Sequence, residues 1–204
     1  MTQKTIDYYL APQSPWTYLG HARLVAIAKK HNAVIHIKPM DLGKIFPISG
    51  GLPLPKRAPQ RQAYRLVELA RFRDHLKMPL NIQPAFFPVA GDPAARVIIA
   101  VREADGQEAA NTVGGKVLSA VWADERNIAD AGTLKLILTE CGLPTTRYEE
   151  SLTDTIQALY DTDTQSAIEA QVFGSPAYVM DGEVFWGQDR LDFVDRKLSS
   201  FLAK

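Results

Sequence analysis

The sequence predicts an α/β fold in which β-structure lies at both ends of the chain and helices fill the middle. Residues 5–10 and 34–38 have the apolar and β-branched composition of strands, and residues 177–186 have the pattern of a β-hairpin. Between these ends, apolar residues recur at helical spacing in successive segments. Strands at the two ends and helices between them favour a single sheet that is built from both ends of the chain.

The first unit of the predicted fold is a strand, a helix and a second strand. The strand of residues 5–10 is followed by apolar positions at helical spacing up to Lys30, and then by the strand of residues 34–38. Ser14 is a favoured helix-capping residue, and Pro15 at the first helical position costs no hydrogen bond. A unit of this size predicts parallel strands with a right-handed crossover.

The middle of the chain is predicted to be helical after an irregular start. Residues 43–56 are rich in glycine and proline, which predicts a loop without regular structure. The apolar spacing and the capping residues then predict helices over residues 60–77, 92–103, 108–122, 130–141, 145–151 and 162–171.

The end of the chain returns to β-structure. Asp181-Gly182 separates two short apolar runs and is a strong hairpin signal, and a closing helix is predicted over residues 190–202. The economical organisation is one discontinuous domain, residues 1–42 and 172–204, with a helical insertion domain over residues 43–171 that begins with the Pro/Gly-rich loop.

Composition excludes several classes of function. The 23 basic and 23 acidic residues give no net charge, so nothing favours binding to nucleic acid or to an anionic membrane. No apolar run is long enough to span a bilayer. Cys141 is the single cysteine, which excludes an internal disulfide and favours a cytoplasmic protein. The four histidines have no metal-ligand spacing, so no metal site is expected.

Ser14 is the first candidate site residue. Thioredoxin-like folds carry a Cys-x-x-Cys pair between the first strand and the first helix, and here Ser14 and Thr17 occupy those positions, so dithiol chemistry is impossible. Ser14 as a plain helix cap is one interpretation. The other is that its hydroxyl and the helix N-terminus stabilise a thiolate that a ligand brings. The two interpretations are compatible.

The second candidate is the loop formed by Phe173, Gly174, Ser175 and Pro176. A thioredoxin-like architecture places a cis-proline opposite the start of the first helix, and Pro176 has that position. A cis bond would present the backbone of Ser175 to an extended peptide.

Charged residues supply the third group of candidates. Asp189 fits either an N-cap of the last helix or a ligand for an ammonium group, and Arg190 fits a carboxylate ligand. Arg61, Arg65, Arg71 and Arg73 are predicted to form a solvated helix face, whereas Lys56 or Arg57, at the end of the loop, is the better candidate for a ligand contact.

The sequence resembles the 2-hydroxychromene-2-carboxylate isomerases, which belong to the DsbA-like, kappa-class glutathione transferase branch of the thioredoxin superfamily. The resemblance covers nearly the whole chain and is carried by the runs Ser14-Pro15-Trp16-x-Tyr18-Leu19, Ala120-Val121-Trp122, Val172-Phe173-Gly174-x-Pro176 and Trp186-Gly187-x-Asp189-Arg190-Leu191.

This resemblance implies a homodimer that binds glutathione and uses Ser14 in catalysis. The expected reaction interconverts 2-hydroxychromene-2-carboxylate and trans-o-hydroxybenzylidenepyruvate in the breakdown of naphthalene and related aromatics. Glutathione would be bound by the loop of residues 173–176 together with Lys56, Asp189 and Arg190, and Trp16, Phe46 and Trp186 would form aromatic walls around the substrate.

Two alternatives use the same scaffold. A kappa-like glutathione transferase or peroxidase acting on other electrophiles would share every residue of the predicted site. A non-enzymatic module that holds an extended peptide beside Pro176 is also compatible with the fold, because fold does not fix function.

Overall fold

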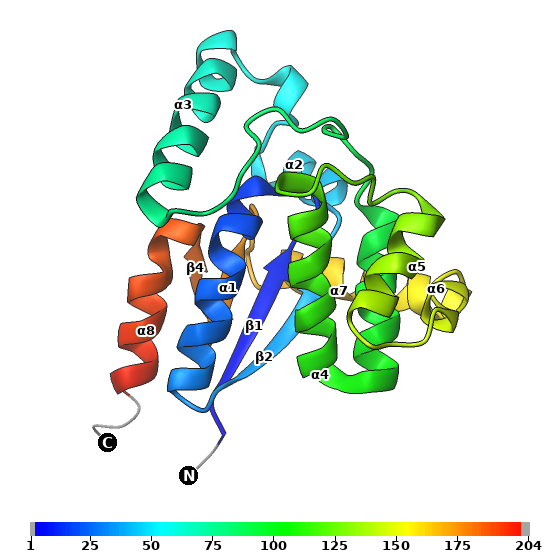
Figure 1. Ribbon diagram of the computed structural model, residues 1–204. Coiled ribbons are helices and arrows are strands. Elements are labelled where there is room, and N and C mark those ends of the chain that lie inside the picture. Colours follow the sequence, from blue (N-terminus) through cyan, green and yellow to red (C-terminus); the bar gives the residue numbers. More distant parts are fainter. Residues whose placement is uncertain (1–2, 201–204) are drawn as a thin grey trace.

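The computed structural model describes residues 3–200, and its centre is one four-stranded sheet (Figure 1). The strand order is β2-β1-β3-β4, where β1 pairs in parallel with β2 and antiparallel with β3. Strands from both ends of the chain therefore form the same sheet, and the predicted α/β fold class is confirmed. The strands are β1 (Thr5–Leu10), β2 (Val34–Pro39), β3 (Ala177–Met180) and β4 (Glu183–Trp186).

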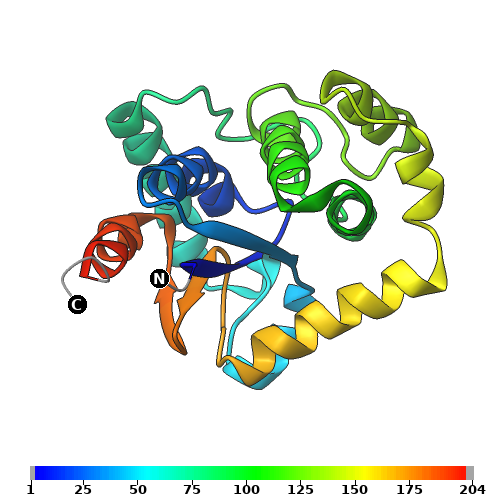
Figure 2. The ribbon, with the colours of Figure 1, turned by 90° about the horizontal axis from the view of Figure 1, so that it is seen from below.

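Alternation along β1 directs side chains into two separate cores, one on each face of the sheet. Ile6, Tyr8 and Leu10 pack against α1 (Pro15–Lys30), α4 (Asp92–Trp122) and α8 (Leu191–Ser200). Tyr9 points the other way and packs with α2 (Leu42–Ser49) and α7 (Asp154–Glu169). Figure 2 shows α1 and α4 on one side of the sheet and α7 on the other.

The helices between β2 and β3 make up a helical group that covers parts of both faces of the sheet. They are α2, a single 3₁₀ turn η1 (Leu54–Lys56), α3 (Pro59–Leu76), α4, α5 (Ala131–Glu140), α6 (Thr146–Glu150) and α7. The two helices predicted over residues 92–103 and 108–122 join across Gly106, whose φ of 88° and ψ of 177° interrupt the helical conformation inside α4.

Two predictions for this region were wrong. Residues 43–56 are not a continuous loop, because α2 forms between the capping side chain of Asp41, which accepts from the Gly43 amide at 2.7 Å, and Gly50, which has a φ of 78°. Burial of Ile45 in the second core holds α2 in place despite Pro47 inside it. Helix α7 also begins well before residue 162, because Thr153 caps it.

The ends of the chain agree with the prediction more closely. The hairpin of β3 and β4 turns at Asp181 and Gly182, which both have positive φ. The helix predicted over residues 190–202 is α8, which begins after a 3₁₀ turn η2 (Gln188–Arg190), and the last two predicted residues lie outside the described part of the chain.

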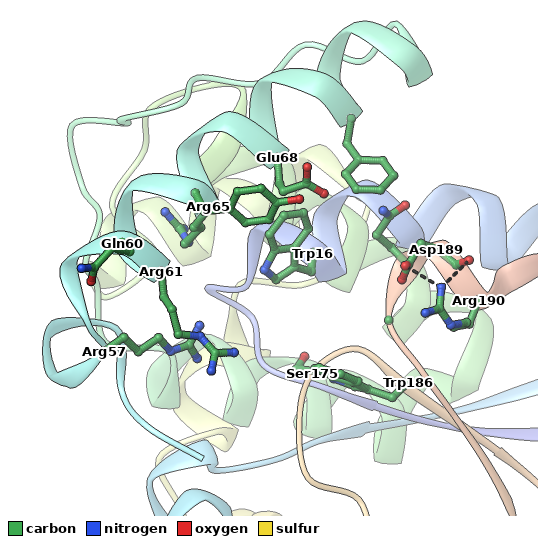
Figure 3. Close-up of a pocket in the computed structure, with 14 residues that line it drawn as sticks. Trp16, Arg57, Gln60, Arg61, Arg65, Glu68, Ser175, Trp186, Asp189 and Arg190 are labelled. Carbon is green, nitrogen blue, oxygen red and sulfur yellow. Dashed lines mark hydrogen bonds and ion pairs between the residues drawn. The ribbon is translucent and has the colours of Figure 1, made fainter. Parts of the chain in front are cut away.

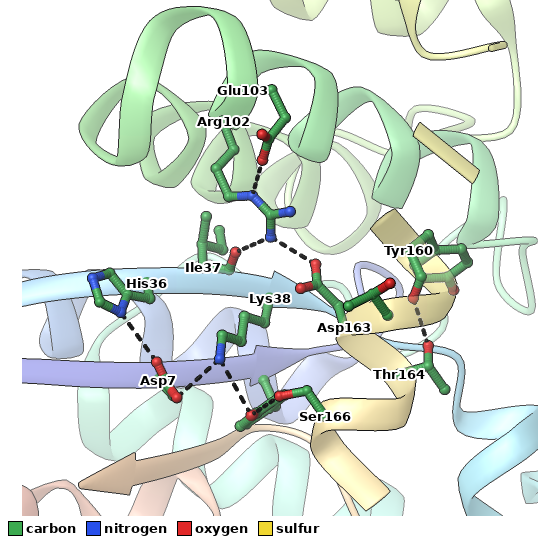
Figure 4. A network of polar contacts seen from close by, with 12 residues as sticks. Asp7, His36, Ile37, Lys38, Arg102, Glu103, Tyr160, Asp163, Thr164 and Ser166 are labelled. Atoms are coloured by element: carbon green, nitrogen blue, oxygen red, sulfur yellow. Dashed lines mark hydrogen bonds and ion pairs between the residues drawn. The ribbon is translucent and has the colours of Figure 1, made fainter. Parts of the chain in front are cut away.

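A polar network joins α4 and α7 to the edge strand β2 (Figure 4). The guanidinium of Arg102 donates to the Asp163 carboxylate at 2.6 Å and to the Ile37 carbonyl at 2.9 Å. Burial raises the pKa of Asp163 to about 6, and Arg102 opposes that rise. Lys38 donates to Asp7 at 2.9 Å on the neighbouring strand. This network fixes the helical group against the sheet that carries the candidate site.

Candidate active site

The candidate site begins at Ser14, where the chain leaves β1 and enters α1. Ser14 is extended, with φ −81° and ψ 124°, and its side chain accepts from the Thr17 amide at 3.3 Å. The predicted helix cap is therefore confirmed. The side chain is nearly buried, and its hydroxyl hydrogen donates to no group among residues 3–200. Ser14 thus keeps a free donor at the positive end of a helix.

The loop of residues 173–176 lies against this helix start, as the sequence predicts. The peptide bond between Ser175 and Pro176 is cis. The Ser175 hydroxyl accepts from the Ala11 amide at 2.8 Å and lies 2.7 Å from the hydroxyl of Thr17. Ser14 and Ser175 therefore both contact Thr17, one through its amide and the other through its hydroxyl. Hydrogen bonds therefore join the start of α1 to the loop before Pro176, although these two segments come from opposite ends of the chain.

A cavity of about 630 Å³ opens beside these two segments (Figure 3). Its walls come from the first turn of α1, from α3, and from the segment between β4 and α8. Five of the predicted site residues line it, namely Trp16, Ser175, Trp186, Asp189 and Arg190. The cavity therefore brings together residues that lie up to about 170 positions apart in the sequence and that the analysis of motifs grouped as one site.

The two sides of the cavity carry different charges. On one side, the Asp189 carboxylate accepts from Arg190 at 2.6 Å, so an anion and a cation lie next to each other. Asp189 lies inside the 3₁₀ turn η2, and the residue directly before α8 is Arg190, so Asp189 does not occupy the N-cap position of α8. On the other side, Figure 3 shows the side chains of Arg57, which precedes α3, and of Arg61, in the first turn of α3, lying close together. Glu68 also lines the cavity, but it accepts from Arg71 at 2.7 Å.

Part of the predicted solvated face of α3 was wrong. Arg57, Arg61 and Arg65 all line the cavity, and whereas Arg61 is exposed as predicted, Arg65 is partly buried. Burial, and then the nearby charge of Arg57, lowers the pKa of Arg65 to about 10. Arg71 and Arg73 do pair with acidic neighbours on the outer surface, as expected for a solvated face.

Aromatic residues of α3 complete the cavity and were missed by sequence reasoning. Tyr64 and Phe72 line it, and Phe72 meets Trp16 edge to face with ring centroids 6.0 Å apart. No local signal in the sequence identifies them, because side chains spaced by four share a helix face whether that face is buried, exposed or lines a cavity. The row of Arg57, Arg61 and Arg65 continues to Arg73, which pairs with Asp74 outside the cavity.

The remaining predicted residues lie outside this cavity. Ser14 and Pro176 do not line it themselves, but each is close in the chain to a lining residue, Ser14 to Trp16 and Pro176 to Ser175. Lys56 is exposed at the end of η1, and Phe46 of α2 packs beside Gly51; neither lines the cavity. Phe173 is 44% exposed, and its ring contacts Trp186 with centroids 4.9 Å apart. Gly174 lies so close to Trp186 that an added Cβ would approach the indole nitrogen to 2.5 Å. Phe173 and Gly174 thus position Trp186, which lines the cavity.

The cavity is set apart from metal sites and membrane-spanning segments, for which residues 3–200 give no evidence. Residues 3–200 contain no cluster of three or more His, Cys, Asp or Glu side chains arranged to hold a metal ion. Within the same range, no helix combines the length and apolar character needed to cross a membrane. The thiol of Cys141 lies half-buried at the end of α5, and burial raises its pKa.

Comparison with known proteins gives relatives along the whole chain. A 2-hydroxychromene-2-carboxylate isomerase of Sphingobium xenophagum is 26% identical over 197 residues, which cover 96% of this chain and 98% of the relative. The protein of the same name from Pseudomonas putida is 28% identical over 193 residues, covering 93% and 92%. A solved structure of a 2-hydroxychromene-2-carboxylate isomerase superposes with a TM-score of 0.82 at 24% identity and covers 97% of this chain and 96% of its own.

A match to a family model identifies the domain family to which the chain belongs. The model of the DSBA-like thioredoxin domain matches residues 5–199, which include every strand and helix of the cavity walls. The cis-proline opposite the first helix and the sheet built from both chain ends agree with that match. The chain therefore belongs to the DSBA-like thioredoxin domain family.

Proposed function

We propose that this protein is a glutathione-dependent isomerase that interconverts 2-hydroxychromene-2-carboxylate and trans-o-hydroxybenzylidenepyruvate in the breakdown of naphthalene-type aromatics. The observation that carries the proposal is the arrangement at the start of α1. There, a serine with a free hydroxyl donor lies beside a cavity that has aromatic walls and charged ends. The relatives named for this isomerisation, which span more than nine-tenths of the chain, support the same reaction class.

Glutathione fits the chemistry of the residues present. Its γ-glutamyl end carries both an ammonium and a carboxylate, and Asp189 and Arg190 offer one partner for each. Its peptide portion is extended, and the backbone beside the cis-proline Pro176 is suited to pairing with an extended chain. These residues would hold the tripeptide with its cysteine toward α1. Lys56 lies outside the cavity, so this proposal assigns the contacts with glutathione to the residues above rather than to Lys56.

Ser14 would then control the protonation state of the bound sulfur. The Ser14 hydroxyl oxygen accepts from the Thr17 amide, which leaves the hydroxyl hydrogen of Ser14 free to donate to an anionic sulfur. The positive end of the α1 dipole adds to that stabilisation, so the thiol pKa should fall. Glutathione, when bound, supplies a nucleophilic thiolate whose reversible addition to the conjugated double bond permits rotation about that bond.

The aromatic walls would place the substrate. Trp16, Tyr64 and Phe72 give the cavity aromatic side chains against which the ring of a substrate can pack. Contact with these rings orients the conjugated chain of the substrate relative to Ser14, and such positioning is a large part of catalysis. Trp186 closes the opposite side.

The proposal is tested by following the ultraviolet spectrum of 2-hydroxychromene-2-carboxylate with the purified protein. We expect conversion to the trans-benzylidenepyruvate with glutathione, and none above background with S-methylglutathione, which has the same charged ends but no thiol. Equal rates in both would show that the thiol has no role. Absence of conversion by the folded protein would favour a transferase or peroxidase acting on another electrophile.

A further inference from the structure

Arg65 is a cation without an anionic partner at the wall of the cavity. Its guanidinium lies over the rings of Phe87 and Trp122, 5.0 and 5.6 Å from their centroids. It makes no hydrogen bond or ion pair with any residue in the range 3–200, and its Nη2 atom is buried without an acceptor. A buried polar nitrogen without a partner is costly, and a buried charge more so.

The neighbours of Arg65 increase this cost. Arg57 and Arg61 line the same side of the cavity, and the Nε of Arg57 donates to the Leu52 carbonyl rather than to an acid. Glu68, one turn along α3, already pairs with Arg71. Burial and the nearby charge of Arg61 lower the pKa of Arg57. An anion entering the cavity would relieve the repulsion between these cations.

The geometry points to the ligand: we propose that Arg65, together with Arg57, binds the carboxylate of the aromatic substrate, an inference that rests on the proposed function. A planar guanidinium matches a carboxylate through two parallel hydrogen bonds. The aromatic walls Trp16, Tyr64 and Phe72 belong to the same cavity, so one molecule can place its ring on them and its carboxylate at Arg65. Asp189 and Arg190 then remain available to bind the zwitterionic end of glutathione (Figure 3).

The carboxylate at Arg65 has two possible sources, because glutathione also ends in one. A structural role is the other alternative, since Arg65 stacks on two rings of the core. The experiment therefore measures binding of three probes separately by calorimetry: benzylidenepyruvate, its uncharged methyl ester, and glutathione. The titrations of the first two contain no glutathione and need no turnover, so their outcome is independent of the isomerase assay.

The variants are Arg65→Met and Arg57→Met, which keep a long side chain but remove the charge. Arg73→Met is the matched control, because Arg73 is on the same helix and pairs with Asp74 outside the cavity. We expect benzylidenepyruvate to bind Arg65→Met on the order of tenfold to a hundredfold more weakly than wild type. The methyl ester and glutathione should bind all proteins alike, and the control should match wild type.

Three results would overturn the inference. Equal loss for benzylidenepyruvate and its ester would show that Arg65 only supports the shape of the cavity. A loss confined to glutathione would assign the subsite to the glutathione carboxylate. Unchanged binding of benzylidenepyruvate to Arg65→Met would show that its carboxylate lies elsewhere. Selective loss for benzylidenepyruvate in a protein without isomerase activity would instead keep the subsite and reject the proposed reaction.

Discussion

The hydroxyl oxygens of Thr17 and Ser175 lie 2.7 Å apart, although 158 positions separate them in the sequence. Thr17 belongs to the first turn of α1, and Ser175 precedes the cis-proline of the closing segment. Because Ser175 also accepts from the Ala11 amide, it ties the end of β1 and the start of α1 to the same loop. This contact joins the two ends of the chain at the point where the proposed chemistry takes place.

The two hydroxyls should not contribute equally to stability. Thr17→Val removes one hydrogen bond and leaves Ser175 with its backbone partner, so the free energy of unfolding should fall by about 1 kcal/mol. Ser175→Ala also leaves the Ala11 amide without this acceptor, which should cost about 1–3 kcal/mol. Urea unfolding of both single variants and of the double variant measures the coupling. Additive effects would contradict a direct contact between the two hydroxyls.

Ser14→Ala should reduce turnover by on the order of 10²-fold, as loss of one oriented donor does elsewhere. It should also lower the unfolding free energy by about 1 kcal/mol, because it removes the cap of α1. Thr153→Ala is the matched control: Thr153 caps α7 through the same type of bond and does not line the cavity. The control should lose stability and keep its activity. Native turnover in Ser14→Ala would remove Ser14 from the mechanism.

Asp189→Ala should weaken glutathione binding on the order of tenfold, since it removes the anionic partner of the glutathione ammonium. Asp192→Ala is the comparison, because Asp192 is nearby on α8, pairs with Arg196 and does not line the cavity. Calorimetric titration of glutathione into both variants distinguishes a specific contact from a general change of charge. Wild-type affinity in Asp189→Ala would rule out this anchor.

Elements with strong local signals could be predicted from the sequence. The cap formed by Ser14 and Pro15 and the Asp181-Gly182 turn each depend on a few adjacent residues, and the structure confirms both. The predicted irregular segment over residues 43–56 was wrong because α2 depends on burial of Ile45 beneath the sheet. Contacts of that kind are invisible in a local window.

The residues of the candidate site likewise fall into those that local motifs predict and those that depend on tertiary structure. Trp16, Ser175 and Asp189 follow from motifs, and in the structure they line one cavity. Arg65 was assigned to a solvated face because nothing local distinguishes it from Arg71, which is on the surface. Only the path of α3 over the cavity separates them.

The buried imidazole of His21 predicts a pH dependence of stability. It lies between the Tyr8 hydroxyl and the Asn111 carbonyl, and burial lowers its pKa to about 4 from the ordinary value of 6.5. Between pH 6.5 and 4 the unfolded chain binds this proton more readily than the folded protein does. The unfolding free energy contributed by His21 should therefore fall as pH falls, by at most about 3 kcal/mol.

His21→Gln should lack this dependence while its amide still donates to Asn111. Burial raises the pKa of Asp163, so that carboxyl contributes a dependence of opposite sign in the same pH range. The informative quantity is thus the difference in slope between wild type and variant, from urea unfolding at several pH values. Parallel curves from pH 6.5 to 4 would show that His21 is protonated equally in both states.

We propose above that Ser14, at the start of α1, stabilises a thiolate brought by glutathione. The most direct measurement is the thiolate absorbance near 240 nm of bound glutathione as a function of pH, in wild type and in Ser14→Ala. In wild type, we predict that the thiol pKa of bound glutathione lies on the order of one to two units below that of free glutathione. In Ser14→Ala, this pKa should rise most of the way back to the value of free glutathione. A bound thiol that titrates like free glutathione in the wild-type protein would contradict the account.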